Sequence, residues 1–244
     1  MDTTTPPAIR CGASRRSALA YDRRHANRRA AFALTHHLHP HAEGWRLRRH
    51  WQGIGGESLY IESVDWHPVH GLRCVEAESP SLGEHLSARA VDDTGSGSAF
   101  ETQRVAARGA RPQARILRPP QRAFTLASAP LEIAAAWPAL KAGARVRRSF
   151  LVLKVQRHAA VDFSLHAQDD ASVTVALTPV ALPLRWWFGR TLFHFARPAF
   201  ALTAIDGLLD PRDRKPNGRW HEYLGRLEFD PPLPLAALLP GHPP

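Results

Sequence analysis

The chain has 244 residues, which is enough for one sizeable domain or two small ones. Its hydrophobic content of 44% is that of an ordinary globular protein and argues against disorder throughout. The 21 prolines and 16 glycines exclude a simple helical bundle and favour many short elements joined by turns.

The formal net charge of +10 is concentrated near the start of the chain. Residues 1–50 contain ten arginines and three acidic residues, which leaves a charge of +3 for the remainder. Because the arginine pairs occur without a sustained apolar stripe, residues 1–44 are predicted to be a basic, disordered leader. A second interpretation is that Arg10–Arg29 bind nucleic acid or an anionic surface. Basic segments that bind nucleic acid usually come with several aromatic side chains or a partner fold that reads bases, whereas Tyr21 is the one aromatic residue of Arg10–Arg29, so nucleic acid is not the expected partner.

A histidine cluster lies at the end of this leader. Neutral imidazole is a good ligand for zinc, nickel and copper, so the cluster is the one candidate for a metal site. Metal sites normally take their ligands from separated elements held by further hydrogen bonds, and Glu43 is the nearest carboxylate. We therefore expect solvated histidines, no metal and no other cofactor. The four residues of the candidate are His36, His37, His39 and His41.

From Trp45 the sequence takes on the alternation typical of β-strands. In Glu57–Trp66, Leu59 and Ile61 fall on one face, and Tyr60 and Glu62 fall on the other. Short strands separated by turns every 10–12 residues are typical of an antiparallel meander. The further strands expected in this part are Leu72–Glu76, Glu84–Val91 and Ala99–Ala106.

A connection and a helix follow these strands. Arg108–Pro120 is rich in proline and arginine and is predicted to be a connection. Leu131–Leu140 is predicted to be a helix, in which Pro138 strains the last turn and which Gly143 ends. A short strand at Arg122–Leu126 is expected before it.

The clearest strands come next, at Arg145–Gln156, Ala159–Ala167 and Ser172–Thr178. Pro179–Gly189 is predicted to be an apolar link or a short helix, because proline interrupts strand pairing. Two last strands, Arg197–Ile205 and Arg219–Phe229, are expected to flank a turn at Asp210–Gly218. The predicted fold is mainly β: a curved antiparallel sheet or barrel-like meander with one or two short helices. It spans residues 45–230 and is followed by a proline-rich tail, 231–244.

The order of these elements resembles a known group of proteins. A helix that ends in Leu140-Lys141-Ala142-Gly143 precedes charged and apolar strands in Val146–Val175. An apolar link, the turn Gly207-Leu208-Leu209-Asp210 and a strand that ends in Leu227-Glu228-Phe229 come after them. This pattern is similar to uncharacterised bacterial envelope proteins with a lipocalin-like or open β-barrel sheet. The resemblance covers about residues 45–230 and implies a β-barrel, with no catalytic residues to transfer.

The location is expected to depend on the natural start of the chain. No apolar stretch reaches the roughly 18–20 residues of a spanning helix. Arg28-Arg29 is followed by too short an apolar run for a secretory signal. As written, the sequence predicts a cytoplasmic protein, and an envelope or periplasmic one if the natural start carries an export signal. Cys11 and Cys74 have no metal-site spacing and leave the compartment open.

The expected function is non-enzymatic binding of an apolar small molecule or lipid in the barrel. Gly95-Ser96-Gly97-Ser98-Ala99 lacks the strand-to-helix setting of a nucleophile elbow, and adjacent acidic residues in turns cannot face each other across a cleft. The alternatives are the basic leader as a binding arm, and an enzyme whose site is assembled only in the fold. The residues predicted to line the ligand site are Trp186, Trp187, Arg190, Tyr60, Trp66 and Phe163.

Overall fold

A computed structural model describes residues 14–22, 30–42, 44–91, 99–182, 189–214 and 220–238. In these residues the chain forms one sheet of 15 strands, which is not closed, and one α-helix. All neighbouring strands are antiparallel except β9 and β10, which are parallel. The predicted class, a mainly β fold with a curved or barrel-like sheet, is confirmed.

The sheet consists of two half-sheets that meet in its middle, because the first strand pairs with the last one. The first half-sheet runs outward in chain order from β1 to β8, and the second runs inward from β9 to β15. The first comprises β1 (Ser14–Asp22), β2 (Ala30–His41), β3 (Gly44–Gly53), β4 (Ser58–His67), β5 (Gly71–Ser79), β6 (Glu84–Val91), β7 (Ala99–Val105) and β8 (Gln113–Leu117). The second comprises β9 (Ala123–Phe124), β10 (Val146–Val152), β11 (Arg157–Gln168), β12 (Ser172–Pro179), β13 (Thr191–Ala196), β14 (Ala201–Arg214) and β15 (Trp220–Pro234).

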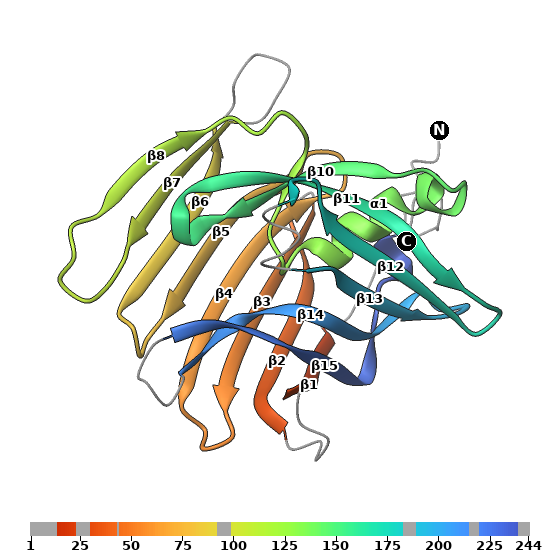
Figure 1. The fold of residues 1–244 in the computed structure, drawn as a ribbon, viewed down its shortest axis with the longest axis horizontal. Coiled ribbons are helices and arrows are strands. Elements are labelled where there is room, and N and C mark those ends of the chain that lie inside the picture. The colour runs from red at the N-terminus through yellow and green to blue at the C-terminus, as the bar shows by residue number, and fades with distance from the viewer. Residues whose placement is uncertain are drawn as a thin grey trace, which may run out of the picture.

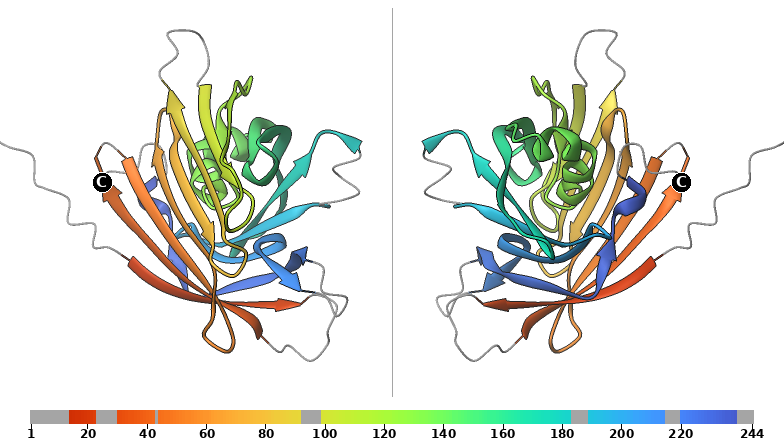
Figure 2. Two further views of the ribbon diagram at one scale, coloured as in Figure 1. Left: turned by 90° about the vertical axis from the view of Figure 1, so that its left-hand side faces the viewer. Right: turned by 90° about the vertical axis from the view of Figure 1, so that its right-hand side faces the viewer.

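The two half-sheets curl toward each other around the helix α1 (Ala129–Lys141), as Figures 1 and 2 show. Strand β9 comes to lie against β5, and a short 3-10 turn, η1 (Leu153–Val155), lies against β6 and β7. These contacts join strands that share no backbone ladder. We call them the seam, because along this line the curled sheet meets itself without closing.

The interior of the curl is an apolar core. Side chains at alternate positions of the strands point into it and fill it. In β4, for example, Tyr60, Glu62, Val64 and Trp66 are buried, while the residues between them lie on the outer face. Burial of one such large apolar side chain contributes roughly 1.5–3 kcal/mol. The bulkiest core residues are Trp51, Trp66, Phe100, Phe124, Phe163, Phe193 and Phe195.

Helix α1 is apolar around most of its circumference and is enclosed by the sheet. Leu131, Ile133, Ala134 and Leu140 are all buried, while Pro138, Ala139 and Lys141 near its C-terminal end are exposed. The predicted helix is therefore confirmed, with Pro138 inside it and Gly143 just beyond it at a φ of 83°. In the part of the chain that the structure describes, no helix is long and apolar enough to cross a membrane.

The prediction of a leader over residues 1–44 is wrong where the structure describes that segment. Ser14–Asp22 and Ala30–His41 are strands β1 and β2, and β1 pairs with a neighbour on each side. Ala18 and Ala20 face the core with 3% and 0% exposure. The stabilisation comes from ladders with β2 and β15, which an alanine- and arginine-rich composition does not reveal. Binding of nucleic acid by Arg10–Arg29 stays a prediction, because these arginine side chains lie outside the described residues.

Three further segments differ from the prediction. Arg108–Pro120, predicted to be a connection, contains strand β8. Asp210–Arg214 belongs to β14 rather than to a turn, and Asn217-Gly218 lies outside the described residues. Strand β15 extends to Pro234, into the predicted tail. Strand β8 itself contains no proline, and Pro211 lies at the bulge of β14, where proline is accommodated.

Candidate functional site: a buried charged cluster between the half-sheets

Two charged side chains face the interior from adjacent strands of the first half-sheet. Arg49 of β3 is opposite Glu62 of β4, and the two residues are 4% and 3% exposed. The guanidinium of Arg49 donates from Nε to Glu62 Oε2 at 3.1 Å, and its Nη2 donates to the same oxygen. Nη2 also donates to Oδ2 of Asp210, a residue of β14, at 2.5 Å. The pair on one half-sheet is thereby joined to the other half-sheet.

Asp210 reaches this position because of a bulge in β14. The register with β15 passes from Leu209 opposite Tyr223 to Arg212 opposite Glu222, so Asp210 and Pro211 are extra residues on β14. Bulges of this kind bend a strand and redirect its side chains. The Asp-Pro pair that resembles a turn in sequence therefore serves to place a carboxylate inside the sheet.

Further ion pairs extend the cluster across the interior. Arg212 Nη2 donates to Glu84 Oε1 at 3.2 Å, and its Nε lies 3.6 Å from Glu222 Oε1. Lys154, from η1, donates to both oxygens of Glu222 at 2.9 and 3.1 Å. The Arg49 cluster, as we call it, comprises Arg49, Glu62, Glu84, Lys154, Asp210, Arg212 and Glu222.

The cluster contains four carboxylates and three cations, and one carboxyl is strongly perturbed. Burial raises the pKa of the Glu62 carboxyl, and the charge of Asp210 raises it further, while Arg49 lowers it. Together these effects bring the pKa of Glu62 to about 7. Burial also raises the pKa of the Tyr60 hydroxyl on the same strand. Burial alone would lower the pKa of Arg49, but Asp210 and Glu62 outweigh it and raise that pKa. Arg49 therefore stays charged while Glu62 titrates near neutrality.

The space beside this cluster is small. A hollow of about 10 Å³ is lined by Tyr60, Ser79, Lys154, Asp210 and Arg212, among others. This volume suits about one water molecule. A carboxyl with a pKa near 7 is suited to proton transfer, but in this conformation the hollow has no room for a substrate. The geometry shown is that of a closed ionic contact between the half-sheets.

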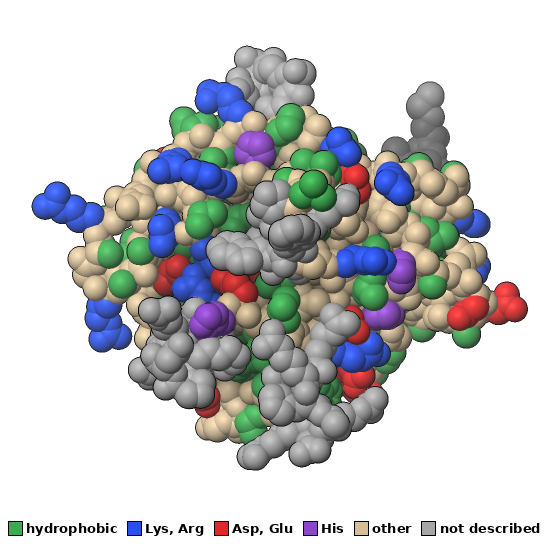
Figure 3. Space-filling model, viewed as in Figure 1, with side chains coloured by type: hydrophobic (Ala, Val, Ile, Leu, Met, Phe, Trp, Pro, Cys, Tyr) green, Lys and Arg blue, Asp and Glu red, His purple; other side chains and the backbone are tan. Residues whose placement is uncertain are grey.

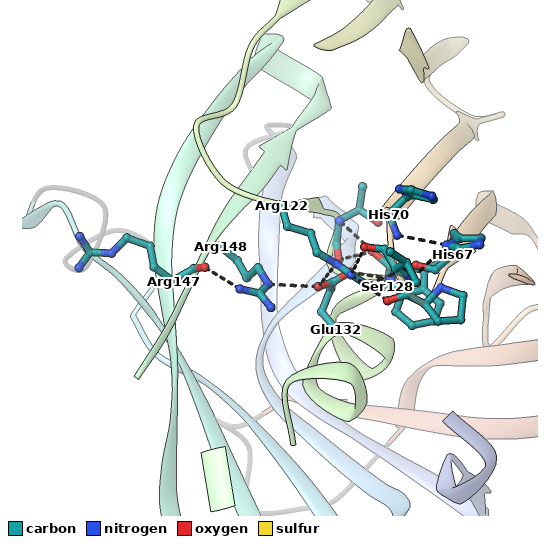
Figure 4. Close-up of polar contacts among 11 residues, drawn as sticks. His67, His70, Arg122, Ser128, Glu132, Arg147 and Arg148 are labelled. Atoms are coloured by element: carbon teal, nitrogen blue, oxygen red, sulfur yellow. Dashed lines mark hydrogen bonds and ion pairs between the residues drawn. The ribbon is translucent and has the colours of Figure 1, made fainter. Parts of the chain in front are cut away.

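A second charged cluster lies at the opposite end of β4, and Figure 4 shows it. Glu132 of α1 is completely buried and accepts from Trp66 Nε1 at 2.6 Å, from Arg122 Nε at 2.9 Å and from Arg148 Nε at 3.2 Å. Arg122 also donates to the carbonyls of His67, Pro68 and Val69 at 3.3, 2.8 and 2.7 Å. The Glu132 cluster (Trp66, Arg122, Glu132 and Arg148) thus ties the helix and β10 to the turn between β4 and β5.

A single glutamine side chain also connects the two sides of the seam. Gln156 follows η1, and its Nε2 donates to the carbonyl and hydroxyl of Thr102, both at 3.2 Å, and to the Gln113 carbonyl at 3.0 Å. Its backbone has a φ of 48°, which is rare for a residue with a side chain. The side chain is buried and fixes the end of β10 on β7 and β8.

The residues predicted to form one ligand site occupy separate places. Tyr60 and Trp66 both face the interior from β4, but they lie at opposite ends of it, beside different charged clusters. Phe163 is in the apolar core of the second half-sheet, with its ring 5.1 Å from that of Phe124. Arg190 is exposed, with Nη1 3.1 Å from His166 Nδ1. Trp186 and Trp187 lie outside the described residues.

Strand alternation separates the four histidines. His36 faces the core, where burial, Arg49 and His37 lower the pKa of its imidazole to about 3. His37 and His39 lie on the other face of β2, and His41 is exposed at the end of the strand. Among the described residues, no three His, Cys, Asp or Glu side chains are grouped to hold a metal ion.

The sequence reasoning missed the charged residues that join the half-sheets, although part of the signal was present. The alternation of Glu57–Trp66 puts Glu62 on the same face as Tyr60 and Val64, and Arg49 shares a face with Trp45 and Leu47. A charge on the apolar face of a strand must be paired when it is buried. Glu132 gives the same signal in a helix that is otherwise apolar. The partners, however, come from distant elements and could not be read from spacing.

Neither a protein-family model nor a curated protein matches this chain. Among solved structures it is similar to a β-barrel-like protein of the domain of unknown function DUF1849 from Brucella abortus. The TM-score is 0.43 and the sequence identity is 10%, over 91% of this chain and 97% of that one. The envelope location and the lipocalin-like character stay predictions. The described chain is an open, barrel-like antiparallel sheet whose half-sheets are joined by buried charged side chains.

Proposed function

We propose that this chain is a non-enzymatic binding protein that holds an apolar or amphipathic small molecule, such as a lipid, between its two half-sheets. The observation that carries the proposal is the seam. The sheet curls around a continuous apolar interior, but side chains rather than a backbone ladder hold its two sides together. Side-chain contacts can be exchanged one at a time, whereas a ladder separates only by breaking many backbone hydrogen bonds.

The interior offers the chemistry that such a ligand needs. Ligand sites are mostly apolar, with a few polar groups that fix orientation. Here Trp66 and Phe163 belong to the apolar part, and Tyr60 lies beside the charged Arg49 cluster at one end. An amphipathic molecule would place its chain in the core and its polar end near that cluster.

Uptake requires the half-sheets to separate, because the hollow of about 10 Å³ beside Tyr60 is too small for a ligand. Gln156 is the residue to test, since its side chain makes three hydrogen bonds across the seam and, among the described residues, none within its own half-sheet. Gln156→Ala removes these bonds and keeps a side chain at the same backbone conformation. Loss of such bonds is expected to raise the rate of opening by roughly fivefold to tenfold.

The experiment has two readouts. Native mass spectrometry on protein purified from its own host, before and after denaturation, is expected to reveal an apolar small molecule that denaturation releases. Stopped-flow fluorescence with phenylnaphthylamine, a neutral apolar probe, is expected to show faster uptake by Gln156→Ala than by wild type. The matched control is Arg147→Ala, which removes an exposed 2.9 Å ion pair to Asp162 inside one half-sheet.

Two results would contradict the proposal. One is a protein that carries no small molecule and takes up no probe, in both the wild-type and the Gln156→Ala form. The other is equal acceleration by Gln156→Ala and Arg147→Ala, because this would show that the probe reports loss of stability rather than opening of the seam.

A further inference from the structure

The two edges of the sheet differ in whether they are accessible. At one edge, β9 has only two residues, Ala123 and Phe124, which are 4% and 0% exposed and lie against β5. At the other edge, β8 pairs with β7 and has no other strand beside it among the described strands. An unpaired edge presents a row of backbone N–H and C=O groups to any extended chain of suitable chemistry.

Strand β8 is held in place although most of its surface is open to solvent. Gln113, Ala114, Arg115 and Ile116 are all exposed, and Ile116 is 57% exposed. The strand is nevertheless anchored, because the Gln113 carbonyl accepts from Gln156 and the Arg115 carbonyl accepts from Thr102 Oγ1 at 3.0 Å. A preformed strand pays little ordering entropy when another segment adds to it.

The segment that contains β8 carries charge of one sign. Between Glu101 and Glu132 the sequence has six arginines and no acidic residue. Arg108, Arg111 and Arg115 are exposed, and none of them forms an ion pair with a described acidic side chain. In Figure 3, Lys and Arg side chains are spread along the rim of the molecule where Figure 1 draws β8.

These charges select among the possible occupants of the edge. A second copy of β8 would bring arginines close to arginines, and like charges on paired strands are destabilising. An acidic strand would gain from the same arginines. We propose that β8 is a docking edge that takes an extended acidic segment of a partner protein as an additional strand of the sheet.

The register of β8 also defines the pattern of the partner. Arg115 is opposite the buried Thr102, and Ile116 is opposite the exposed Glu101, so these two neighbours lie on opposite faces. Side chains of an added strand alternate in the same way. The segment that fits best therefore alternates acidic residues, beside Arg115, with apolar residues, beside Ile116.

Binding of short peptides to the full chain tests this mode. The probe is a soluble peptide that alternates glutamate and valine, measured by fluorescence anisotropy at low salt. The first control has proline in place of the valines, so that it keeps the charge but cannot pair as a strand. The second control has lysine in place of the glutamates. The glutamate–valine peptide is expected to bind, and both controls are expected to bind at least about tenfold more weakly.

A matched pair of charge reversals places the site. Arg115→Glu lies on β8, and Arg145→Glu lies on an exposed position between α1 and β10. Arg115→Glu is expected to weaken binding of the acidic peptide about tenfold and to improve binding of the lysine peptide, while Arg145→Glu leaves both nearly unchanged. Both residues are exposed, so folding should be retained, and circular dichroism checks this.

Several outcomes would overturn the proposal. Equal binding of the proline peptide would show a purely electrostatic contact without strand addition. Equal effects of Arg115→Glu and Arg145→Glu would show that the peptide does not bind at β8. Tighter binding of a short DNA duplex than of any peptide would assign the basic edge to nucleic acid instead.

Discussion

The two charged clusters close the same interior, but they are balanced in opposite ways. In the Glu132 cluster, one buried carboxylate receives an indole N–H and two guanidinium groups. In the Arg49 cluster, four carboxylates share three cations, and the pKa of the Glu62 carboxyl is about 7. Three donors fix the orientation of the Glu132 side chain, whereas the excess of carboxylates in the Arg49 cluster leaves Glu62 able to take up a proton. One end of the interior is thus a fixed joint, and the other responds to pH.

The largest expected effect comes from removing the centre of the fixed joint. Glu132→Ala leaves Trp66 Nε1 and the guanidinium groups of Arg122 and Arg148 without their common acceptor. Breaking a buried pair from one side costs about 3–5 kcal/mol. Urea titration should show this loss in the free energy of unfolding. Arg147→Ala, which removes the exposed pair with Asp162, should lose much less, because solvent screens that pair. A loss of similar size in both variants would refute the distinction between buried and exposed pairs.

A comparison of two buried tryptophans measures the contribution of one hydrogen bond in the Glu132 cluster. Trp66 and Trp51 are 1% and 0% exposed. Trp66 Nε1 donates to Glu132 at 2.6 Å, while Trp51 Nε1 has no hydrogen-bond partner among the described residues. Replacing either residue by phenylalanine removes similar apolar area. Trp66→Phe should therefore be more destabilising than Trp51→Phe by about 1.5–3 kcal/mol, the contribution of a hydrogen bond to a charged group. Equal unfolding midpoints in the two variants would show that the bond to Glu132 contributes nothing.

The responsive joint is tested by the pH dependence of stability. The pKa of Glu62 is raised from 4.5 to about 7, so the folded state binds more protons than the unfolded state between these values. The free energy of unfolding should therefore fall as pH rises through this window, and Glu62→Gln should lose this dependence. The difference between the two profiles should be on the order of 1–3 kcal/mol, measured by urea titration from pH 5 to 8.

His36 makes the free energy of unfolding depend on pH in the opposite direction, which is why the comparison with Glu62→Gln is needed. Its pKa is lowered from 6.5 to about 3, so the unfolded state binds the additional proton and stability falls as pH decreases below about 6.5. The two slopes partly cancel in wild type. Because His36 is present in both proteins, subtracting the two profiles isolates Glu62. Parallel profiles would show that Glu62 does not titrate in this range.

The sequence predicted most of the strands, but not the side-chain contacts that join the two half-sheets. Glu84–Val91 was predicted with its observed bounds, because alternation is a local property of the strand. Strand β8 was not predicted, because Arg108–Pro120 has the prolines of a connection and because, among the described strands, β8 forms a ladder with β7 alone. Asp210 was assigned to a turn, although a bulge places it beside Arg49. Pairings between positions 161 residues apart depend on how the sheet curls, and this is not encoded in any local window.

The smallest expected effect is also the most specific, and it concerns Lys154. This residue lies on η1 and pairs with the partly exposed Glu222, so Lys154→Gln should lower the free energy of unfolding by less than about 1 kcal/mol. The charge of Lys154 also contributes to lowering the pKa of Glu62. Its removal should therefore move the midpoint of the pH profile upward and slightly enlarge the Glu62 contribution, because that contribution grows with the difference between the folded and unfolded pKa values. Arg147→Ala serves again as the control, because it changes a charge outside the cluster. An unchanged midpoint in Lys154→Gln would mean that the seam residue and Glu62 do not form one electrostatic unit, and the responsive joint would then reduce to the contact of Glu62 with Arg49 and Asp210.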